Sequence, residues 1–141
     1  MKHFDVAIID EATQILEPQL LGILCARGED GKDAIDKFVL IGDHKQLPAV
    51  VQQNTEQSAI YDESLLSIGL ANLKDSLFER LYRNCTATVH RSYDMLCRQG
   101  RMHPEVALFA NRAFYGGRLI PVGLPHQIES SDTMCRLAFY P

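Results

Sequence analysis

FDVAIIDEAT, residues 4–13, is the stretch that says most about the fold of this chain. Val6 to Ile9 form a short apolar run without a helical period, and such runs are typical of parallel strands buried on both faces. Asp10 and Glu11 follow where the strand is expected to end, at the sheet edge where open α/β proteins bind ligands. One acid there can hold a magnesium ion while the next orients or deprotonates a water. A strand followed by a solvated turn is the alternative.

Composition limits the class of protein. The 141 residues suffice for one modest domain or parts of two, and a net charge of −4 argues against a stand-alone nucleic-acid binder. No apolar stretch approaches the ~20 residues that span a bilayer, and we expect no signal peptide. The four cysteines are scattered without a C-x-x-C pair. They therefore predict reduced thiols in a cytoplasmic protein rather than zinc ligands or disulfides.

The residues after the two acids predict a βαβ unit. Pro18 suits the first turn of a helix whose apolar face continues to Leu24, and Gly28 is expected to end that helix. The polar stretch 28–36 reads as a surface loop, and FVLI, residues 38–41, reads as a second strand. A strand, a helix, a loop and a strand at this spacing favour a parallel sheet.

The rest of the chain gives a less complete prediction, with residues 83–93 unassigned and strand-like fragments in residues 118–141. Residues 64–73 can form a helix, and Ser76 begins a capping box for the helix behind it. Residues 86–89 have the composition of a strand. Pro104 opens a further helix that Gly116 is expected to end. The apolar face expected for this helix comprises Val106, Phe109, Ala110 and Ala113.

Two further polar segments follow DEAT along the chain. GDHKQLP, residues 42–48, comes after the second strand and presents Asp43, Lys45 and Gln46 toward the same crevice as the first acids. The Gln46 amide can donate to a phosphate oxygen or accept from a lytic water, so it can sense a γ-phosphate. A polar turn whose exit is set by Pro48 is the alternative.

QGRMHP, residues 99–104, is the third segment and precedes the helix expected at Pro104. Arg101 there can neutralise charge that develops in a transition state. The alternative is a helix N-terminus with Arg101 on the surface, which is the better reading of an isolated arginine. The order and spacing of the three segments are much more specific than any one of them.

Together the three segments resemble motifs of the superfamily 1 helicases, in the branch that includes the nonsense-mediated-decay RNA helicase and the DNA replication helicase-nucleases. DEAT at residues 10–13 resembles motif II, GDHKQLP resembles motif III and QGRMHP resembles motif IV. FYGGRL, residues 114–119, resembles the segment that closes the next helix in that family. The resemblance covers about residues 4–50 and 96–120, in the family's order.

This resemblance implies an α/β fold, with a partial RecA-like (P-loop NTPase) parallel sheet, flanking helices and the beginning of a second RecA-like domain. Residues 1–90 would be the C-terminal half of the first RecA-like domain, with motifs II and III. Residues 91–141 would start the second domain, with motif IV. The chain would be part of an ATP-dependent DNA or RNA helicase, in which hydrolysis stimulated by single-stranded nucleic acid drives translocation and unwinding.

The resemblance also implies roles for individual residues. Asp10 would bind Mg²⁺, Glu11 would polarise the attacking water, and Gln46 would contact the γ-phosphate of ATP. Arg101 would reach the same phosphate from the second domain. The further candidates for binding the nucleotide are Asp43 and Gln99.

Two features depart from the family's pattern. Gly100 stands where the family usually has Tyr, and we expect it to loosen the backbone beside Arg101. The phosphate-binding loop G-x-x-x-x-G-K-[ST] does not occur in the sequence, and GKD at residues 31–33 is the nearest fragment. We therefore expect a helicase fragment that begins just before motif II, stops early in the second domain and is inactive by itself.

Two other classes of function remain open. The chain could be a non-enzymatic module for self-association or protein interaction, because a half-sheet has exposed edges and apolar surface that favour a homodimer. It could also belong to a different P-loop ATPase without helicase function, although QGRMHP argues against that.

Overall fold

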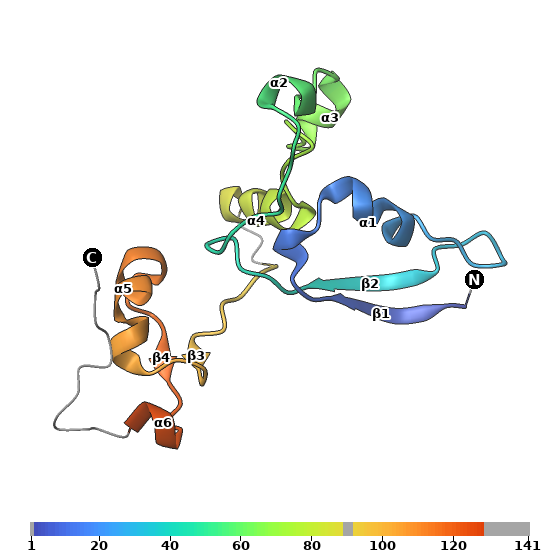
Figure 1. The fold of residues 1–141 in the computed structure, drawn as a ribbon. Helices are drawn as coiled ribbons and strands as arrows, with labels where there is room; N and C mark the ends of the chain where they lie inside the picture. The colour runs from blue at the N-terminus through green and yellow to red at the C-terminus, as the bar shows by residue number, and fades with distance from the viewer. Residues whose placement is uncertain (1, 89–91, 129–141) are drawn as a thin grey trace. The chain divides into compact units, whose positions relative to one another are not determined.

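The computed structural model describes residues 2–88 and 92–128, which belong to two compact units, Met1–Tyr93 and Asp94–Pro141. Each unit combines a short parallel sheet with flanking helices (Figure 1), so the predicted α/β fold is confirmed. The assignment of the two units to successive RecA-like domains stays a prediction. No helix in the described parts is long and apolar enough to cross a membrane.

The sheet of the first unit is formed by β1 (Phe4–Ile9) and β2 (Ile35–Leu40), which run parallel with Ala7 opposite Phe38. They are connected by α1 (Glu17–Leu24), which lies along one face of the sheet (Figure 1). A strand, a helix and a parallel strand form a βαβ unit, as the sequence predicted.

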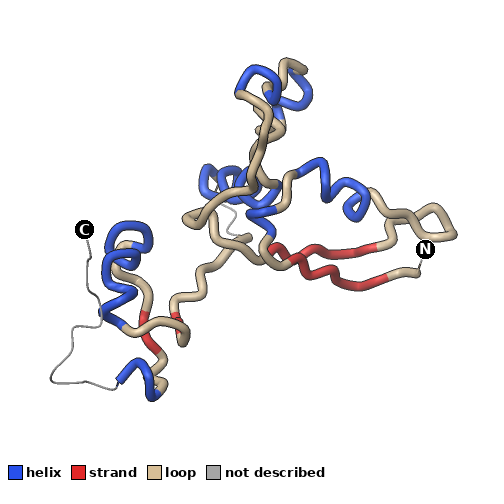
Figure 2. Tube along the Cα trace, in the orientation of Figure 1, coloured by secondary structure: helices blue, strands red, loops and turns tan. Residues whose placement is uncertain are grey.

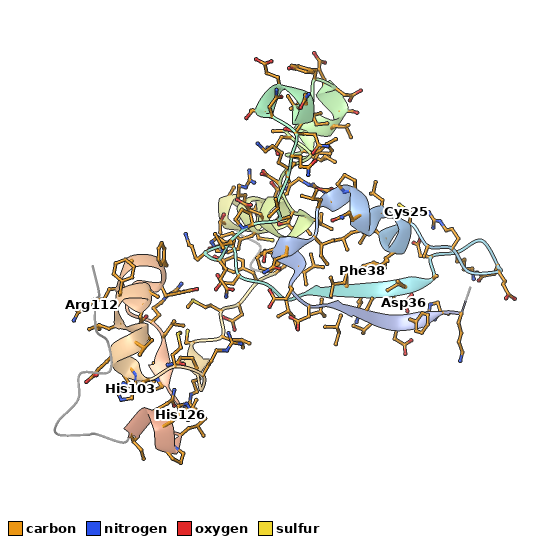
Figure 3. The ribbon with its side chains drawn as sticks, viewed as in Figure 1. Cys25, Asp36, Phe38, His103, Arg112 and His126 are labelled. Atoms are coloured by element: carbon orange, nitrogen blue, oxygen red, sulfur yellow. The ribbon has the colours of Figure 1, made fainter. Side chains whose placement is uncertain are left out.

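Only one face of this sheet is covered by described residues. Phe38 is half-buried between β2 and α1 (Figure 3). On the opposite face Val6, Ile8 and Val39 are 47%, 67% and 45% exposed. The expectation that both faces are buried is therefore wrong for the second face, because no described element packs against it.

The segment between α1 and β2 forms a tight hairpin-like loop. Cys25 closes α1 by donating its N–H to the carbonyl oxygen of Leu21 at 2.9 Å, so the helix ends before the expected stop at Gly28. An antiparallel bridge between Arg27 and Asp33 then returns the chain toward β2.

Two short helices, α2 (Thr55–Ser58) and α3 (Glu63–Ser67), precede the longer helix of the first unit. Asp62 caps α3 by accepting the N–H of Ser64 at 2.9 Å. The helix expected over residues 64–73 is shorter than predicted, because Gly69 has a φ of 82° and ends it.

The longer helix is α4 (Leu77–Ala87), and Ser76 caps it by accepting the N–H of Glu79 at 3.1 Å. This is the cap that the sequence predicted. The strand expected at residues 86–89 is wrong for 86–88, because α4 continues through Ala87 and Thr88 is its C-cap. Val89 lies outside the described residues.

A nearly buried ion pair joins α4 to α1. Arg80 Nε donates to Glu17 Oε2 at 2.8 Å and its Nη2 donates to Oε1, with the two side chains 12% and 9% exposed. Arg80 Nη1 also donates to the carbonyl oxygen of Ile68 at 2.9 Å. A backbone bridge between Leu16 and Ser76 lies just before Glu17 and α4 in the sequence. The segment that follows Asp10 and Glu11 is thus fixed on α4.

In the second unit, β3 (Arg98–Gln99) and β4 (Ile120–Pro121) form a parallel pair connected by α5 (Pro104–Tyr115). A further helix, α6 (Pro125–Ile128), follows β4. α5 begins at Pro104 and is followed by Gly116 with a φ of 60°, as predicted.

The buried side of α5 differs from the prediction. Ala107 is 4% exposed, whereas Val106 and Phe109 of the expected apolar face are 42% and 72% exposed. Asn111, one turn after Ala107, donates its Nδ2 to the carbonyl oxygen of Leu119 and accepts the N–H of Leu119, both at 2.9 Å. The apolar period of the sequence does not determine which side of the helix packs on the rest of the unit. In the structure a small residue, Ala107, and a polar one, Asn111, make that contact.

Candidate functional site

The segments that follow β1 and β2 lie side by side in the first unit (Figure 2). Ala12 donates its N–H to the carbonyl oxygen of Ile41, and Ile41 donates to that of Ile9, both at 2.8 Å. A Cβ on Gly42 would lie 2.9 Å from Thr13 Cγ2 and 3.0 Å from Thr13 N. Only glycine permits this approach, so Gly42 lets DEAT and GDHKQLP pack directly on one another.

Asp10 and Glu11 are both exposed at the end of β1. Glu11 has a φ of 52° and a ψ of 35°, and among the described non-glycine residues it alone has a positive φ. Its N–H donates to Asp10 Oδ1 at 2.9 Å, and no described residue forms a hydrogen bond or an ion pair with its carboxylate. A left-handed glutamate is unfavourable by roughly 1–2 kcal/mol, and such strain gathers at functional sites.

The Asp10 carboxylate suits the metal that the sequence predicts. Mg²⁺ is usually held by one or two carboxylates, several waters and the phosphates of the substrate rather than by a full protein cage. An exposed aspartate at the end of a parallel strand fits such a site. Glu11, directed by a left-handed backbone, is the adjacent carboxylate that can act on a water.

Asp43 orders the loop after β2. Its Oδ1 accepts the N–H of Lys45 at 3.0 Å, and its Oδ2 accepts Gln46 Nε2 at 3.0 Å. Its carbonyl oxygen accepts the N–H of Gln46 at 3.1 Å. One of the two N–H groups of Gln46 Nε2 is therefore engaged, and among described residues none donates to its Oε1. The second N–H can donate to a phosphate oxygen, and Oε1 can accept a hydrogen bond from a water.

Gln99 lies in the second unit and shapes the loop that carries Arg101. Gln99 Oε1 accepts the N–H of Met102 at 2.8 Å, and Nε2 donates to the carbonyl oxygen of Met102 at 2.9 Å. Both ends of its amide thus close a turn around Arg101. A direct contact of Gln99 with a nucleotide stays a prediction.

Gln127 also holds this loop, and nothing in the sequence marks it as a site residue. It is 3% exposed, and its Nε2 donates to the carbonyl oxygens of Gln99 and Met102, both at 2.9 Å. Its Oε1 accepts the N–H groups of Gly123 and Leu124 at 3.1 and 3.2 Å. No motif or spacing marks this glutamine, since the carbonyl groups to which it donates lie 28 and 25 residues away in the sequence.

Arg101 itself is exposed and has no hydrogen bond or ion pair with any described residue. The glycine beside it, Gly100, is closely surrounded, and the expectation that it loosens the backbone stays a prediction. A Cβ on Gly100 would lie 3.1 Å from Leu124 Cδ1 and 3.3 Å from Val122 Cγ2, so these two side chains pack on the glycine. The His126 ring Nε2 lies 2.8 Å from the Gly100 carbonyl oxygen (Figure 3).

Comparison with known proteins identifies the family. Two family models, each described as an AAA domain, match residues 1–54 and 73–135. The chain is 35% identical over 119 residues to the DNA replication ATP-dependent helicase/nuclease DNA2 of Gallus gallus, which covers 84% of this chain and 9% of that protein. The chain belongs to the superfamily 1 helicases.

Two further helicase-family relatives match a similar share of the chain. The probable helicase MAGATAMA 3 of Arabidopsis thaliana is 37% identical over 118 residues, which is 84% of this chain and 12% of that protein. The 3'-5' exoribonuclease HELZ2 of Mus musculus is 37% identical over 113 residues, or 79% of this chain and 3% of that protein. The chain spans about a tenth or less of each of these relatives.

The predicted helicase family is thus confirmed, and the matched ranges contain all three polar segments. The structure brings Asp10, Glu11, Asp43 and Gln46 into neighbouring segments of the first unit, and it places Gln99 and Arg101 in one loop of the second. The roles of these six helicase residues in catalysis stay predictions.

Proposed function

We propose that this chain supplies the metal-binding, water-orienting and phosphate-sensing residues of the ATPase site of a nucleic-acid helicase. The packing of Thr13 on Gly42 supports this most, because it places the acids of one segment beside the ordered loop of the other. Membership of the superfamily 1 helicases supports the reaction, which is hydrolysis of ATP.

In this proposal Asp10 holds Mg²⁺, and the ion neutralises charge on the phosphates when it is bound. Glu11 accepts a proton from the attacking water, or orients that water for attack. Gln46 Oε1 accepts a hydrogen bond from the same water, and Asp43 holds Gln46 in that position. These residues lie on two neighbouring segments and together would form one polar site.

Arg101 contributes from the second unit in this proposal. Its guanidinium has no described partner, so it is available to stabilise charge on the transferred phosphoryl group. Gln99 and Gln127 hold the turn that carries it. Hydrolysis would then be coupled to movement along single-stranded DNA or RNA, with the nucleic acid bound mainly by other parts of the protein, since this chain carries a net charge of −4.

The test compares the chain with a graft. In the graft, the 119 matched residues replace their counterparts in the Gallus gallus relative. The isolated chain, which has no G-x-x-x-x-G-K-[ST] sequence, is expected to show no ATP turnover above background. The graft should hydrolyse ATP when single-stranded DNA and Mg²⁺ are present.

The charge-neutral variant Glu11→Gln should abolish this turnover, by a factor of about 10² or more. The matched control Glu29→Gln lies in the exposed loop before β2 and should leave turnover unchanged. A graft that folds cooperatively but has no turnover would contradict the proposal. Robust turnover by the isolated chain that Glu11→Gln removes would contradict its inactivity.

Self-association is the second candidate, favoured by the exposed apolar face of the β1–β2 sheet. Ile8 on this face is 67% exposed. A dimer through this face would appear in sedimentation velocity as a concentration-dependent species. Ile8→Lys should abolish it, whereas Leu47→Lys, at an 85% exposed loop position, should not.

A further inference from the structure

A chain of three aromatic rings begins in the GDHKQLP loop. The His44 ring lies 4.3 Å from the Tyr82 ring of α4, between centroids, with an interplanar angle of 33°. The Tyr82 ring meets the Tyr93 ring edge-on at 5.0 Å. All three residues belong to the first unit, and Tyr93 is its last residue. The helicase resemblance assigned no role to any of them.

The charges around His44 favour a neutral ring. Burial against α4 lowers the pKa of His44 most, and the adjacent Lys45 lowers it further. Asp43 on the same loop and Glu79 on α4 raise the pKa but do not outweigh these effects. The imidazole is therefore uncharged at neutral pH and packs on Tyr82 as an aromatic ring.

We propose that His44 is a positioning residue: by stacking on Tyr82 it fixes the Gly42–Pro48 loop on α4, and Tyr82 extends this contact to Tyr93 at the end of the unit. Asp43 and Gln46 flank His44 within two residues, so the ring contact sets where the Gln46 amide lies. A change in the loop is then transmitted to the point where the first unit ends. The part of this inference that concerns Gln46 and ATP rests on the proposed function, whereas the ring contacts do not.

The absence of tryptophan from the chain permits a direct optical test. In the 141-residue chain, Tyr82→Trp places a single tryptophan against His44, and a protonated imidazole in contact quenches indole fluorescence. Emission should fall with decreasing pH, with a midpoint below the ordinary histidine pKa of about 6.5. Adding His44→Gln should remove this step. The matched control Tyr61→Trp, at an 80% exposed position, should show no step that depends on His44.

Adding Tyr93→Leu to the Tyr82→Trp chain tests the last contact. Loss of the edge-on ring should move the midpoint back toward about 6.5. In the Tyr82→Trp chain that keeps Tyr93, a midpoint at or above 6.5 would overturn the positioning role. A step that survives His44→Gln would overturn it as well. An unchanged midpoint in the Tyr93→Leu chain would overturn the extension to Tyr93.

The graft tests the link to catalysis. His44→Gln should lower kcat by about tenfold, as is usual when a residue that orients a functional side chain is lost. His44→Phe keeps a ring on Tyr82 and should restore most of kcat, and equal losses in both variants would contradict the link. A graft without turnover would count against the proposed function, whereas a failed optical test would count against the stack alone.

Discussion

The two loops that carry the proposed ATPase residues are held in different ways. In the first unit the segment after β1 is fixed by backbone bonds to the end of β2 and by the packing of Thr13 on Gly42. In the second unit the loop around Arg101 is fixed by two side-chain amides, those of Gln99 and Gln127. The first arrangement follows from strand pairing, and the second depends on particular polar side chains.

This difference matters for how each loop can respond to change. Backbone pairing tolerates most side-chain substitutions, except where two segments touch closely. Removal of a buried amide that bonds several backbone groups takes a hydrogen bond from all of them at once. We therefore expect substitutions of Gln99 and Gln127 to destabilise the Arg101 loop. For the Asp10–Glu11 segment, we expect the destabilising substitutions to be at Gly42 and at the Arg80–Glu17 pair, which is the segment's anchor on α4.

The largest effect is expected at that anchor, the Arg80–Glu17 pair. Arg80→Met leaves the Glu17 carboxylate, whose side chain is 9% exposed, without its partner. Removal of one member of a nearly buried pair destabilises by about 3–5 kcal/mol, measured as a loss in the free energy of unfolding in urea. Replacing both members, in Glu17→Leu with Arg80→Met, should recover part of the loss.

The matched control for the anchor is Arg83→Met. Arg83 pairs with Asp75 at a more exposed position, where the side chains are 50% and 28% exposed. Exposed pairs contribute about 0–1 kcal/mol. Equal losses for Arg80→Met and Arg83→Met would show that the anchor is no stronger than a surface pair.

In the second unit the largest effect is expected for Gln127→Leu. The change removes two donated and two accepted hydrogen bonds from a residue that is 3% exposed. The N–H groups of Gly123 and Leu124 lose Gln127 Oε1 as acceptor, whereas the carbonyl oxygens of Gln99 and Met102 keep the Val122 N–H and Gln99 Nε2 as donors. We expect a loss of about 1–3 kcal/mol in the free energy of unfolding. Amide exchange of Gly123 and Leu124 should accelerate, while amides of β1 and β2 keep their protection.

Gln127→Glu separates the two sides of this amide. Glutamate keeps the oxygen that accepts from Gly123 and Leu124 but loses the donor to Gln99 and Met102. Amide exchange in the Gln99–Met102 turn should be faster than in the native chain. If neither variant alters amide exchange in the second unit, the Gln127 side chain does not fix the loop around Arg101.

A smaller effect is expected for Gly42→Ala in the first unit. The added Cβ would meet the backbone nitrogen of Thr13 at 3.0 Å, and backbone yields less easily than a flexible side chain. We expect a loss of about 1–3 kcal/mol in the free energy of unfolding, the usual range for overpacking. Gly22→Ala is the control, because a Cβ at this position in α1 meets nothing within 4 Å and alanine favours a helix.

The two loops also differ in how far the sequence could predict them. The apolar runs and their spacing predicted β1, α1 and β2, and parallel pairing then placed the two polar segments together. The left-handed backbone at Glu11 and the role of Gln127 could not be predicted, because both depend on contacts between distant segments. The strand expected at 86–88 failed because α4, begun by its Ser76 cap, continued through residues with good strand propensity.

The smallest effect, and one of opposite sign, is expected for Glu11→Gly. Glycine adopts a φ of 52° without the steric penalty of a side chain, so the variant should be more stable in urea by about 1 kcal/mol. The gain is limited because glycine also has more freedom in the unfolded chain. Glu11→Ala is the control, since alanine removes the carboxylate but keeps the strain. If Glu11→Gly stabilises the chain and abolishes turnover in the graft, the left-handed turn is retained for the carboxylate it presents. If Glu11→Gly and Glu11→Ala have equal stability, the backbone at Glu11 is unstrained. Strand pairing alone would then determine its conformation, as it does for the rest of the first loop.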